Sequence, residues 1–178
     1  MKRIGFAALL LLLSSTAVWA QFTPSNENLH GLTGVRLIVM YQRAEGLEAS
    51  QRPAVLKILE EDATAKLQMA GLQLFHYEGE MQKAGYPRLV VLVTLDKVNG
   101  FVHPIVTEVK LLQKVQLVRD PSVAFDAVSW ARYGVGGPTL DLTMLRNQTN
   151  RLVEEFIKDY QSANQDGLAL GSKTAPKN

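Results

Sequence analysis

The chain has 178 residues, with 19 basic and 17 acidic side chains and no cysteine. Two of the basic residues, and no acidic one, lie in the first 20 residues, so the rest of the chain is electrically balanced. That balance removes the electrostatic basis for binding nucleic acid or an anionic membrane surface, and the lack of cysteine excludes disulfides and a thiol nucleophile.

Residues 1–20 have the order of a cleavable secretory signal. A basic start precedes the apolar run 4–13, and the small side chains of Val18 and Ala20 stand before a cut at Gln21. The alternative is a membrane anchor, but this run is short against the roughly 20 residues that span a bilayer. No cysteine follows the run, so lipid attachment at the cut is excluded. We expect a mature protein without a membrane span, in the periplasm or outside the cell.

The first half of the mature chain predicts a strand and a helix. Residues 21–33 are polar and predict an irregular leader, and residues 35–41 alternate at period two as a strand does. A helix of about 20 residues follows from Ser50, with Pro53 in its first turn and Gly71 as its stop. Its apolar stripe consists of Val55, Ile58, Leu59, Ala63, Leu67 and Ala70.

Two strands and a turn are predicted next. Residues 72–77 alternate as a short strand, residues 78–87 contain two glycines and a proline and predict a loop, and residues 89–95 are apolar on both faces, as in a central strand. Asn99-Gly100 is the strongest turn signal in the chain and predicts a hairpin into the following strand.

The second half predicts an antiparallel pair of strands. A long strand over 105–117 has one apolar face, formed by Ile105, Val109, Leu111, Val115 and Leu117. Residues 120–122 turn the chain, and residues 125–133 return as a strand with Val128 and Trp130 on one face. Residues 134–138 are rich in glycine and are expected to stop that strand.

A final helix completes a single domain over residues 34–164. It is predicted over 141–164 from the stripe Leu145, Thr149, Leu152, Val153, Phe156, Ile157 and Tyr160, and residues 165–178 are expected to form a disordered tail. The order β-α-β-β-β-β-α predicts an α+β fold, with a mixed, mostly antiparallel sheet and two helices packed on one face.

The sequence predicts no catalytic residue, no metal ligand and no cofactor. His30, His76 and His103 are far apart in the chain, although the last two could meet at a rim of the sheet. No Gly-x-Ser-x-Gly elbow is present. The acidic run 60–62 lies on consecutive helix positions, which diverge, so we expect a solvated face and not a general acid–base pair.

Three further patterns leave alternatives. The glycines of 134–139 precede a helix, where phosphate loops occur, but no Gly-Lys-Ser or Gly-Lys-Thr is present, so a flexible turn is expected. Trp130, with Phe125 and Tyr133 nearby, predicts either a core tryptophan, which we favour, or an exposed binding surface. Asn147 begins a glycosylation sequon whose threonine lies on the buried stripe, so we discount it.

Two stretches carry a resemblance. They are residues 109–119, continued by 128–130, and residues 152–160, closed by 163–164. Together they resemble small exported bacterial proteins, and the order of elements over roughly 34–164 resembles the compact modules of envelope accessory proteins, such as the N-terminal domain of TolB. The resemblance implies an envelope context and transfers no catalytic or ligand residue.

These observations favour a non-enzymatic interaction protein of the bacterial envelope. The edges of a half-open sheet can accept a strand from a partner protein, and the leader 21–33 could act as such a strand or cover an edge in its own chain. The alternatives are a small-ligand binder with a pocket between helices and sheet, and a hydrolase whose site is assembled from distant residues.

Overall fold

The computed structural model describes residues 26–45, 47–83, 85–98, 101–102, 105–137 and 141–171. The predicted signal 1–20, the first residues of the leader, His103 and residues 172–178 lie outside this part of the chain.

A five-stranded mixed sheet forms one layer. Its strands are β1 (Gly34–Ala44), β2 (Gln73–Leu74), β3 (Arg88–Leu95), β6 (Val106–Leu117) and β7 (Asp120–Val135), in the order β2-β1-β3-β6-β7. Strand β1 runs parallel to β2 and β3, while β3, β6 and β7 are antiparallel neighbours and contribute most of the paired positions. The predicted α+β class with a mixed, mostly antiparallel sheet is confirmed.

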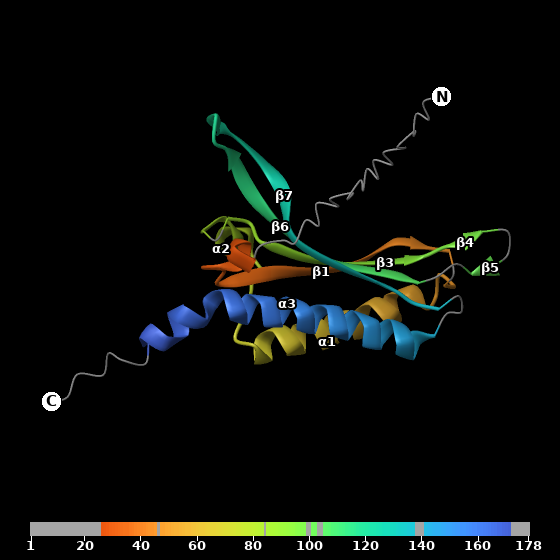
Figure 1. The fold of residues 1–178 in the computed structure, drawn as a ribbon. Helices are drawn as coiled ribbons and strands as arrows, with labels where there is room; N and C mark the ends of the chain where they lie inside the picture. Colours follow the sequence, from red (N-terminus) through yellow and green to blue (C-terminus); the bar gives the residue numbers. More distant parts are fainter. Residues whose placement is uncertain are drawn as a thin grey trace, which may run out of the picture.

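Two long helices, α1 (Arg52–Met69) and α3 (Leu142–Gly171), lie side by side on one face of the sheet (Figure 1). Their stripes are buried as expected from helical spacing, apart from Ile58 of α1, which is exposed. The buried side chains include Val55, Leu59, Ala63 and Leu67 of α1, and Leu145, Thr149, Leu152, Val153 and Phe156 of α3. They pack on alternate residues of the strands, which include Val35, Leu89, Val91, Val109 and Leu111. This interface is the core, and it confirms the predicted placement of both helices.

A short helix, α2 (Glu78–Lys83), lies where the sequence predicts a loop over 78–87. The carboxylate of Glu80 accepts hydrogen bonds from the backbone N–H groups of His76, at 3.1 Å, and Tyr77, and so ties the helix to the chain before it. Met81 is buried, which anchors the helix to the rest of the fold. The loop prediction missed this helix because Met81 is the only apolar side chain in the sequence of Glu78–Lys83, so no apolar stripe marks it.

A two-stranded ribbon of β4 (Lys97–Val98) and β5 (Phe101–Val102) projects from the end of β3 (Figure 1). Asn99 and Gly100 lie outside the described residues, but the strands on either side of them pair antiparallel, as a hairpin requires. In the sequence, this ribbon lies between β3 and β6. In the main sheet, β3 and β6 pair directly with each other.

The leader enters the core as a helical turn. It contains a 3-10 helix, η1 (Asn26–Leu29), whose Asn28 side chain donates to the carbonyl of Ser129 at 3.1 Å. Asn164 of α3 accepts a hydrogen bond from the N–H of Gly31 at 2.9 Å. Within the described residues, the leader thus lies against β7 and α3 of its own chain, and it does so without forming a strand.

The predicted boundaries of the last strand and helix need correction. Helix α3 continues to Gly171, so residues 165–171 are helical and not part of a tail; Leu168 and Ala169 are strong helix formers. Strand β7 begins at Asp120 and passes through Gly134, so the turn lies at Val118-Arg119 and not at 120–122.

A bulge in β7 changes the face that each side chain occupies. Trp130 pairs with Leu111 and Val128 with Leu112, which leaves Ser129 as an extra residue. Because Leu111 and Leu112 are consecutive, they point to opposite faces, and so do Trp130 and Val128. The prediction that these two residues share a face is therefore wrong.

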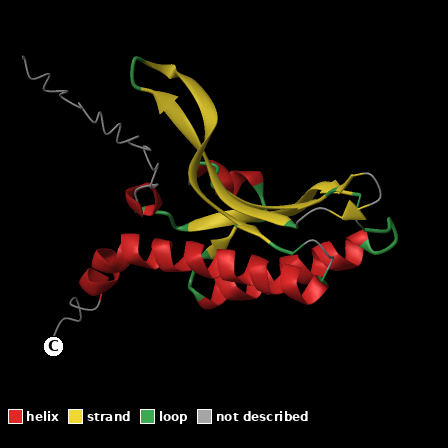
Figure 2. Cartoon of the chain, turned by 45° about the vertical axis from the view of Figure 1, so that its right-hand side comes forward, coloured by secondary structure: helices red, strands yellow, loops and turns green. Residues whose placement is uncertain are grey.

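Beyond this bulge, strands β6 and β7 leave the helical layer as a free hairpin. Figures 1 and 2 show it rising away from α1 and α3, and we call residues 112–128 the arm. Strand β3 pairs with β6 only as far as Leu112, so among the described residues no third strand supports the arm. The predicted buried face of β6 accordingly ends at Leu111, and Val115 and Leu117 are only partly buried.

Candidate functional site

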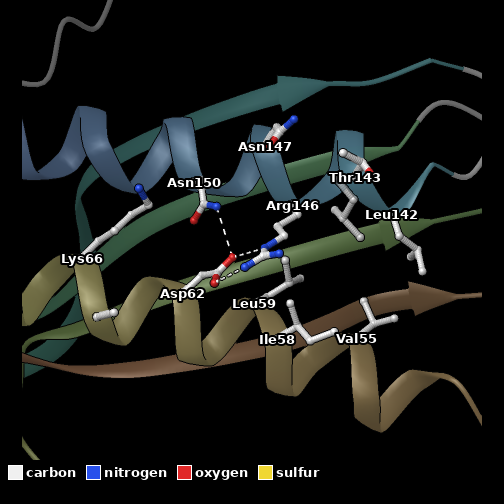
Figure 3. Close-up of a pocket in the computed structure, with 12 residues that line it drawn as sticks. Val55, Ile58, Leu59, Asp62, Lys66, Leu142, Thr143, Arg146, Asn147 and Asn150 are labelled. Atoms are coloured by element: carbon white, nitrogen blue, oxygen red, sulfur yellow. Dashed lines mark hydrogen bonds and ion pairs between the residues drawn. The ribbon is translucent and has the colours of Figure 1, made fainter.

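Two features stand out as candidate binding surfaces: a groove between α1 and α3, and the arm. The groove has a volume of about 590 Å³, within the usual range for a small-molecule site. It lies between the two helices and not between helices and sheet (Figure 3). Its lining includes Val55, Ile58, Leu59, Asp62 and Lys66 of α1, and Leu142, Leu145, Arg146, Asn147 and Asn150 of α3.

Asp62 is the polar centre of the groove. Arg146 donates to its two carboxylate oxygens, with Nε at 2.5 Å and Nη2 at 2.8 Å, and Asn150 donates through Nδ2 at 3.2 Å (Figure 3). The side chain of Asp62 is 19% exposed, whereas that of Arg146 is 54% exposed. These contacts join positions 84 and 88 residues apart in the sequence, and they bridge the two helices.

The ion pair fixes the protonation of both groups. Hydrogen bonding by Arg146 lowers the pKa of Asp62, and the partnership raises the pKa of Arg146. Asp62 is therefore a carboxylate with its oxygens already engaged, which suits neither a general acid nor a general base at neutral pH. The sequence predicts a solvated run over 60–62; Glu60 and Glu61 are exposed as expected, but Asp62 is turned toward α3.

The other end of the groove is apolar. Ile58, which the predicted stripe places in the core, is 45% exposed, and Leu142 on the facing helix is 46% exposed. Together with Val55 and Leu59 they form an apolar floor and walls beside the ion pair. This arrangement can accept an apolar group beside the polar side chains of Asp62, Lys66 and Arg146.

The arm exposes apolar side chains on both of its faces. Val118 at the turn is fully exposed, and Val123, Phe125 and Val128 are each between 43% and 48% exposed. Val115 lies directly across from Phe125, which gives the arm an apolar strip on one face. Burying such side chains is worth roughly 25 cal/mol per Å², so their exposure favours contact with another surface.

The base of the arm is fixed by three contacts. Arg88 of β3 forms an ion pair with Asp126 at 2.7 Å. The N–H of Lys114 donates to the carbonyl of Gly85 at 3.0 Å, and the Lys114 ammonium lies 4.8 Å from the centre of the Tyr86 ring. The arm is thus held in one direction by the body of the fold before any partner arrives, which lowers the entropic cost of binding.

The two described histidines lie apart from any site. His30 follows η1 and His76 follows β2, and both are exposed. His103 lies outside the described residues, so the predicted meeting of His76 with His103 stays a prediction. Across the described part of the chain, no three histidine or acidic side chains gather closely enough to hold a metal ion.

The glycine-rich segment before α3 serves packing. Gly134 is buried against Gln148, and a Cβ there would come within 2.8 Å of Nε2 of that side chain. The first free N–H groups of the helix, on Thr143 and Met144, already donate to the carboxylate of Asp141. An anion at this helix end would have to displace that cap, so the structure favours the turn over the phosphate loop.

The aromatic residues near the arm divide between core and surface. Trp130 is 1% exposed and packs edge-on against Phe156, with ring centres 5.1 Å apart, which confirms the core interpretation of Trp130. Tyr133, in contrast, is 75% exposed on the other face of the sheet.

Among the described helices, none is long and apolar enough to cross a membrane.

The sequence matches no protein-family model and none of the curated proteins. Among solved structures, a PelC dodecamer from Paraburkholderia phytofirmans is 16% identical, covers 72% of this chain and 90% of its own, and gives a TM-score of 0.37. Rare lipoprotein B from Shewanella oneidensis is 13% identical, covers 77% of this chain and 96% of its own, and gives a TM-score of 0.23. Such distant likenesses assign neither family nor function, and the resemblance to TolB stays a prediction.

Proposed function

We propose that this chain is an exported, non-enzymatic accessory protein of the bacterial envelope, and that it binds another protein chain through the arm. Export rests on the signal pattern of residues 1–20. The absence of a reaction is part of the proposal. It is supported by Asp62, the acidic group of the groove between α1 and α3, whose carboxylate already accepts hydrogen bonds from Arg146.

The observation that carries this proposal is the exposed, unsupported arm. A two-stranded ribbon buries too little surface to be stable alone, and here it is built on a rigid base fixed through Arg88 and Lys114. Its free edge offers unpaired backbone groups, and its faces offer Val123 and Phe125. A partner strand would satisfy the backbone and cover these side chains at once.

A capture experiment tests this proposal. Mature protein, residues 21–178, is immobilised and compared with the variant V123S/F125S and with the matched surface variant I58S. We expect wild type and I58S to retain the same partner chain from periplasmic extract, and V123S/F125S to lose it. Equal capture by all three proteins, or capture of nothing, would contradict a role for the arm.

The groove supports a second candidate, a small-ligand binder. Its volume of about 590 Å³ and its apolar end at Ile58 and Leu142 favour an amphipathic molecule. A thermal-shift screen against a metabolite and lipid panel tests it, because a ligand that binds only the folded state raises the melting temperature. The variant Ile58→Trp should fill the groove and abolish any such shift; a shift that survives this variant would place the ligand elsewhere.

A further inference from the structure

We propose that the groove between α1 and α3 binds a single-chain amphiphile with an anionic head group, such as a long-chain carboxylate. The head lies on Arg146 and the chain lies along Ile58 and Leu142. This inference rests on the second candidate function, because it names the ligand of the same groove. Three observations support it: a free edge on the Arg146 guanidinium, the charge at one end of the groove, and the exposed apolar side chains at the other end.

Arg146 keeps a free hydrogen-bonding edge. Its Nε and Nη2 donate to the two oxygens of Asp62 at 2.5 and 2.8 Å. Because a guanidinium has more N–H groups than this fork uses, Nη1 and the second hydrogen of Nη2 have no partner among the described residues. They form a second edge of the same planar group, with the geometry that fits a carboxylate. Arg146 lines the groove and its side chain is 54% exposed, so a ligand there can reach this edge.

The guanidinium is positioned before any ligand binds. Asp62, which holds it, is mostly buried and also accepts a hydrogen bond from Asn150 at 3.2 Å, so this carboxylate is tied to α3 at two positions (Figure 3). A side chain that is already fixed loses less conformational freedom on binding than a free surface side chain. Arg146 is therefore better suited to hold an anion than an unrestrained surface arginine.

The charges at this end of the groove favour an anion. Among the described residues that line the groove, Lys66 and Arg146 are cationic and Asp62 is acidic. The pKa of Asp62 is lowered chiefly by Arg146 and also by the charge of Lys66, so both cations act at the same end. Lys66 forms an ion pair with Glu154, but Glu154 is exposed and does not line the groove, so water screens its charge. A cationic head group would meet two like charges here.

The other end of the groove favours an apolar chain. Ile58 of α1 and Leu142 of α3 both line it, and they are 45% and 46% exposed. Figure 3 shows Val55 and Leu142 at one end of the groove and Lys66 at the other. From Val55 to Lys66, α1 rises about 16 Å along its axis, at about 1.5 Å per residue. A long unbranched chain can cover this distance and remove both exposed side chains from water.

Other ligands would use only half of the groove. A small inorganic anion would bind the free edge of Arg146 and leave Ile58 and Leu142 in water. A neutral amphiphile would cover the apolar end and leave the guanidinium edge without an acceptor. An anionic amphiphile satisfies both ends at once, which is why we favour it.

Calorimetric titration of mature protein, residues 21–178, tests this inference. The probe is dodecanoate below its micelle concentration. Acetate has the same head group without the chain, and dodecyltrimethylammonium has the same chain with a cationic head. We expect dodecanoate to bind with a single-site isotherm, and the other two compounds to give no binding. Equal binding of dodecanoate and dodecyltrimethylammonium, or no binding of dodecanoate, would overturn the inference.

Variants locate the binding site. Arg146→Gln should weaken dodecanoate binding about tenfold through loss of a charge-assisted contact, and Ile58→Trp should abolish binding by filling the groove. Arg151→Gln is the matched control, because Arg151 is a similarly exposed arginine of α3 that pairs with Glu155 outside the groove. Arg146→Lys, which keeps the charge without the fork, should be intermediate and serves if Arg146→Gln does not fold by thermal melting. Unchanged affinity in folded Arg146 variants, or binding that survives Ile58→Trp, would contradict the assignment.

The outcomes separate this inference from the proposed functions. V123S/F125S should bind dodecanoate as the wild type does; loss of binding in that variant would move the amphiphile to the arm and overturn the inference. If dodecanoate does not bind while V123S/F125S loses a captured protein, the arm proposal stands and the groove assignment fails. If a neutral ligand from the thermal-shift panel binds and Ile58→Trp abolishes its shift, the groove is a ligand site and only the anionic head group is wrong.

Discussion

The indole N–H of Trp130 donates to Oδ2 of Asp159 at 2.9 Å, and this bond joins the sheet to α3. The same oxygen accepts a hydrogen bond from Nη2 of Arg132 at 3.0 Å, and the Arg132 guanidinium lies 5.1 Å from the Trp130 ring centre. Asp159 therefore satisfies two donors that are partly or fully withdrawn from water.

Asp159→Ala should leave both donors without a partner. We expect a loss of about 2 kcal/mol in the free energy of unfolding, the usual cost of an unsatisfied buried donor. Trp130 is the only tryptophan after residue 20, so its fluorescence reports directly on this contact. The exposed neighbour Lys158→Ala is the control; an equal loss from both variants would argue against a special role for Asp159.

Asp62→Asn should destabilise the protein in a pH-dependent manner. The pKa of Asp62 is lowered in the folded state, chiefly by Arg146, so its contribution is complete above the unfolded value of about 3.9 and is lost as the pH falls through the folded value. We expect a deficit of about 1 kcal/mol at neutral pH that disappears in acid.

Chemical denaturation across the acid range measures this difference. Glu61→Gln, one residue earlier on α1 and exposed, should change stability little at any pH. A deficit for Asp62→Asn that stays constant down to strongly acidic pH would show that the ion pair with Arg146 is not its source.

Gly134→Ala should destabilise through contact with Gln148. The new Cβ would lie 2.8 Å from Nε2 and 2.9 Å from Cγ of that buried side chain, which implies a cost of about 1–3 kcal/mol for overpacking. Because the clash is with a side chain, adding Gln148→Ala should recover part of the loss in a double-mutant cycle. Gly79→Ala, where no atom lies within 4 Å of the new Cβ, is the matched control. Strict additivity would show that backbone strain and not the clash is responsible.

Asn164→Ala should release the leader from the core. The side chain bonds the N–H of Gly31 at 2.9 Å and the carbonyls of Leu29 and Tyr160 at 3.0 and 2.8 Å. We expect a loss of about 1–2 kcal/mol and faster hydrogen exchange at Gly31. The exposed Gln161→Ala serves as control, and unchanged exchange at Gly31 in Asn164→Ala would contradict the assignment.

The parts of the fold that follow from local periodicity could be predicted from sequence. Val55, Leu59, Ala63 and Leu67 recur at helical spacing, and residues 89–95 form an apolar run with the length of a strand; both are buried as expected. Such patterns depend only on which side chains one element hides from water.

The parts that depend on how two elements meet could not be predicted in this way. The contact of Asp62 with Arg146 joins positions 84 residues apart and requires the relative rotation of two helices. The extra residue in β7, Ser129, has no local sequence signal, and without it the faces of the arm are assigned wrongly. One sequence signal did indicate the free arm. The predicted strand 89–95 is shorter than the predicted strand 105–117, so it cannot pair with the far end of that longer strand.

The single extra residue at Ser129 has a consequence for how this surface can change. Side chains in a strand alternate between faces, so deleting one residue exchanges the two faces of everything beyond it. Loss of Ser129 would turn Asp126 away from Arg88 and bring Phe125 toward that guanidinium, while the strands under the helices keep their register. A one-codon deletion can therefore invert the chemistry presented by the hairpin without altering the body that carries it.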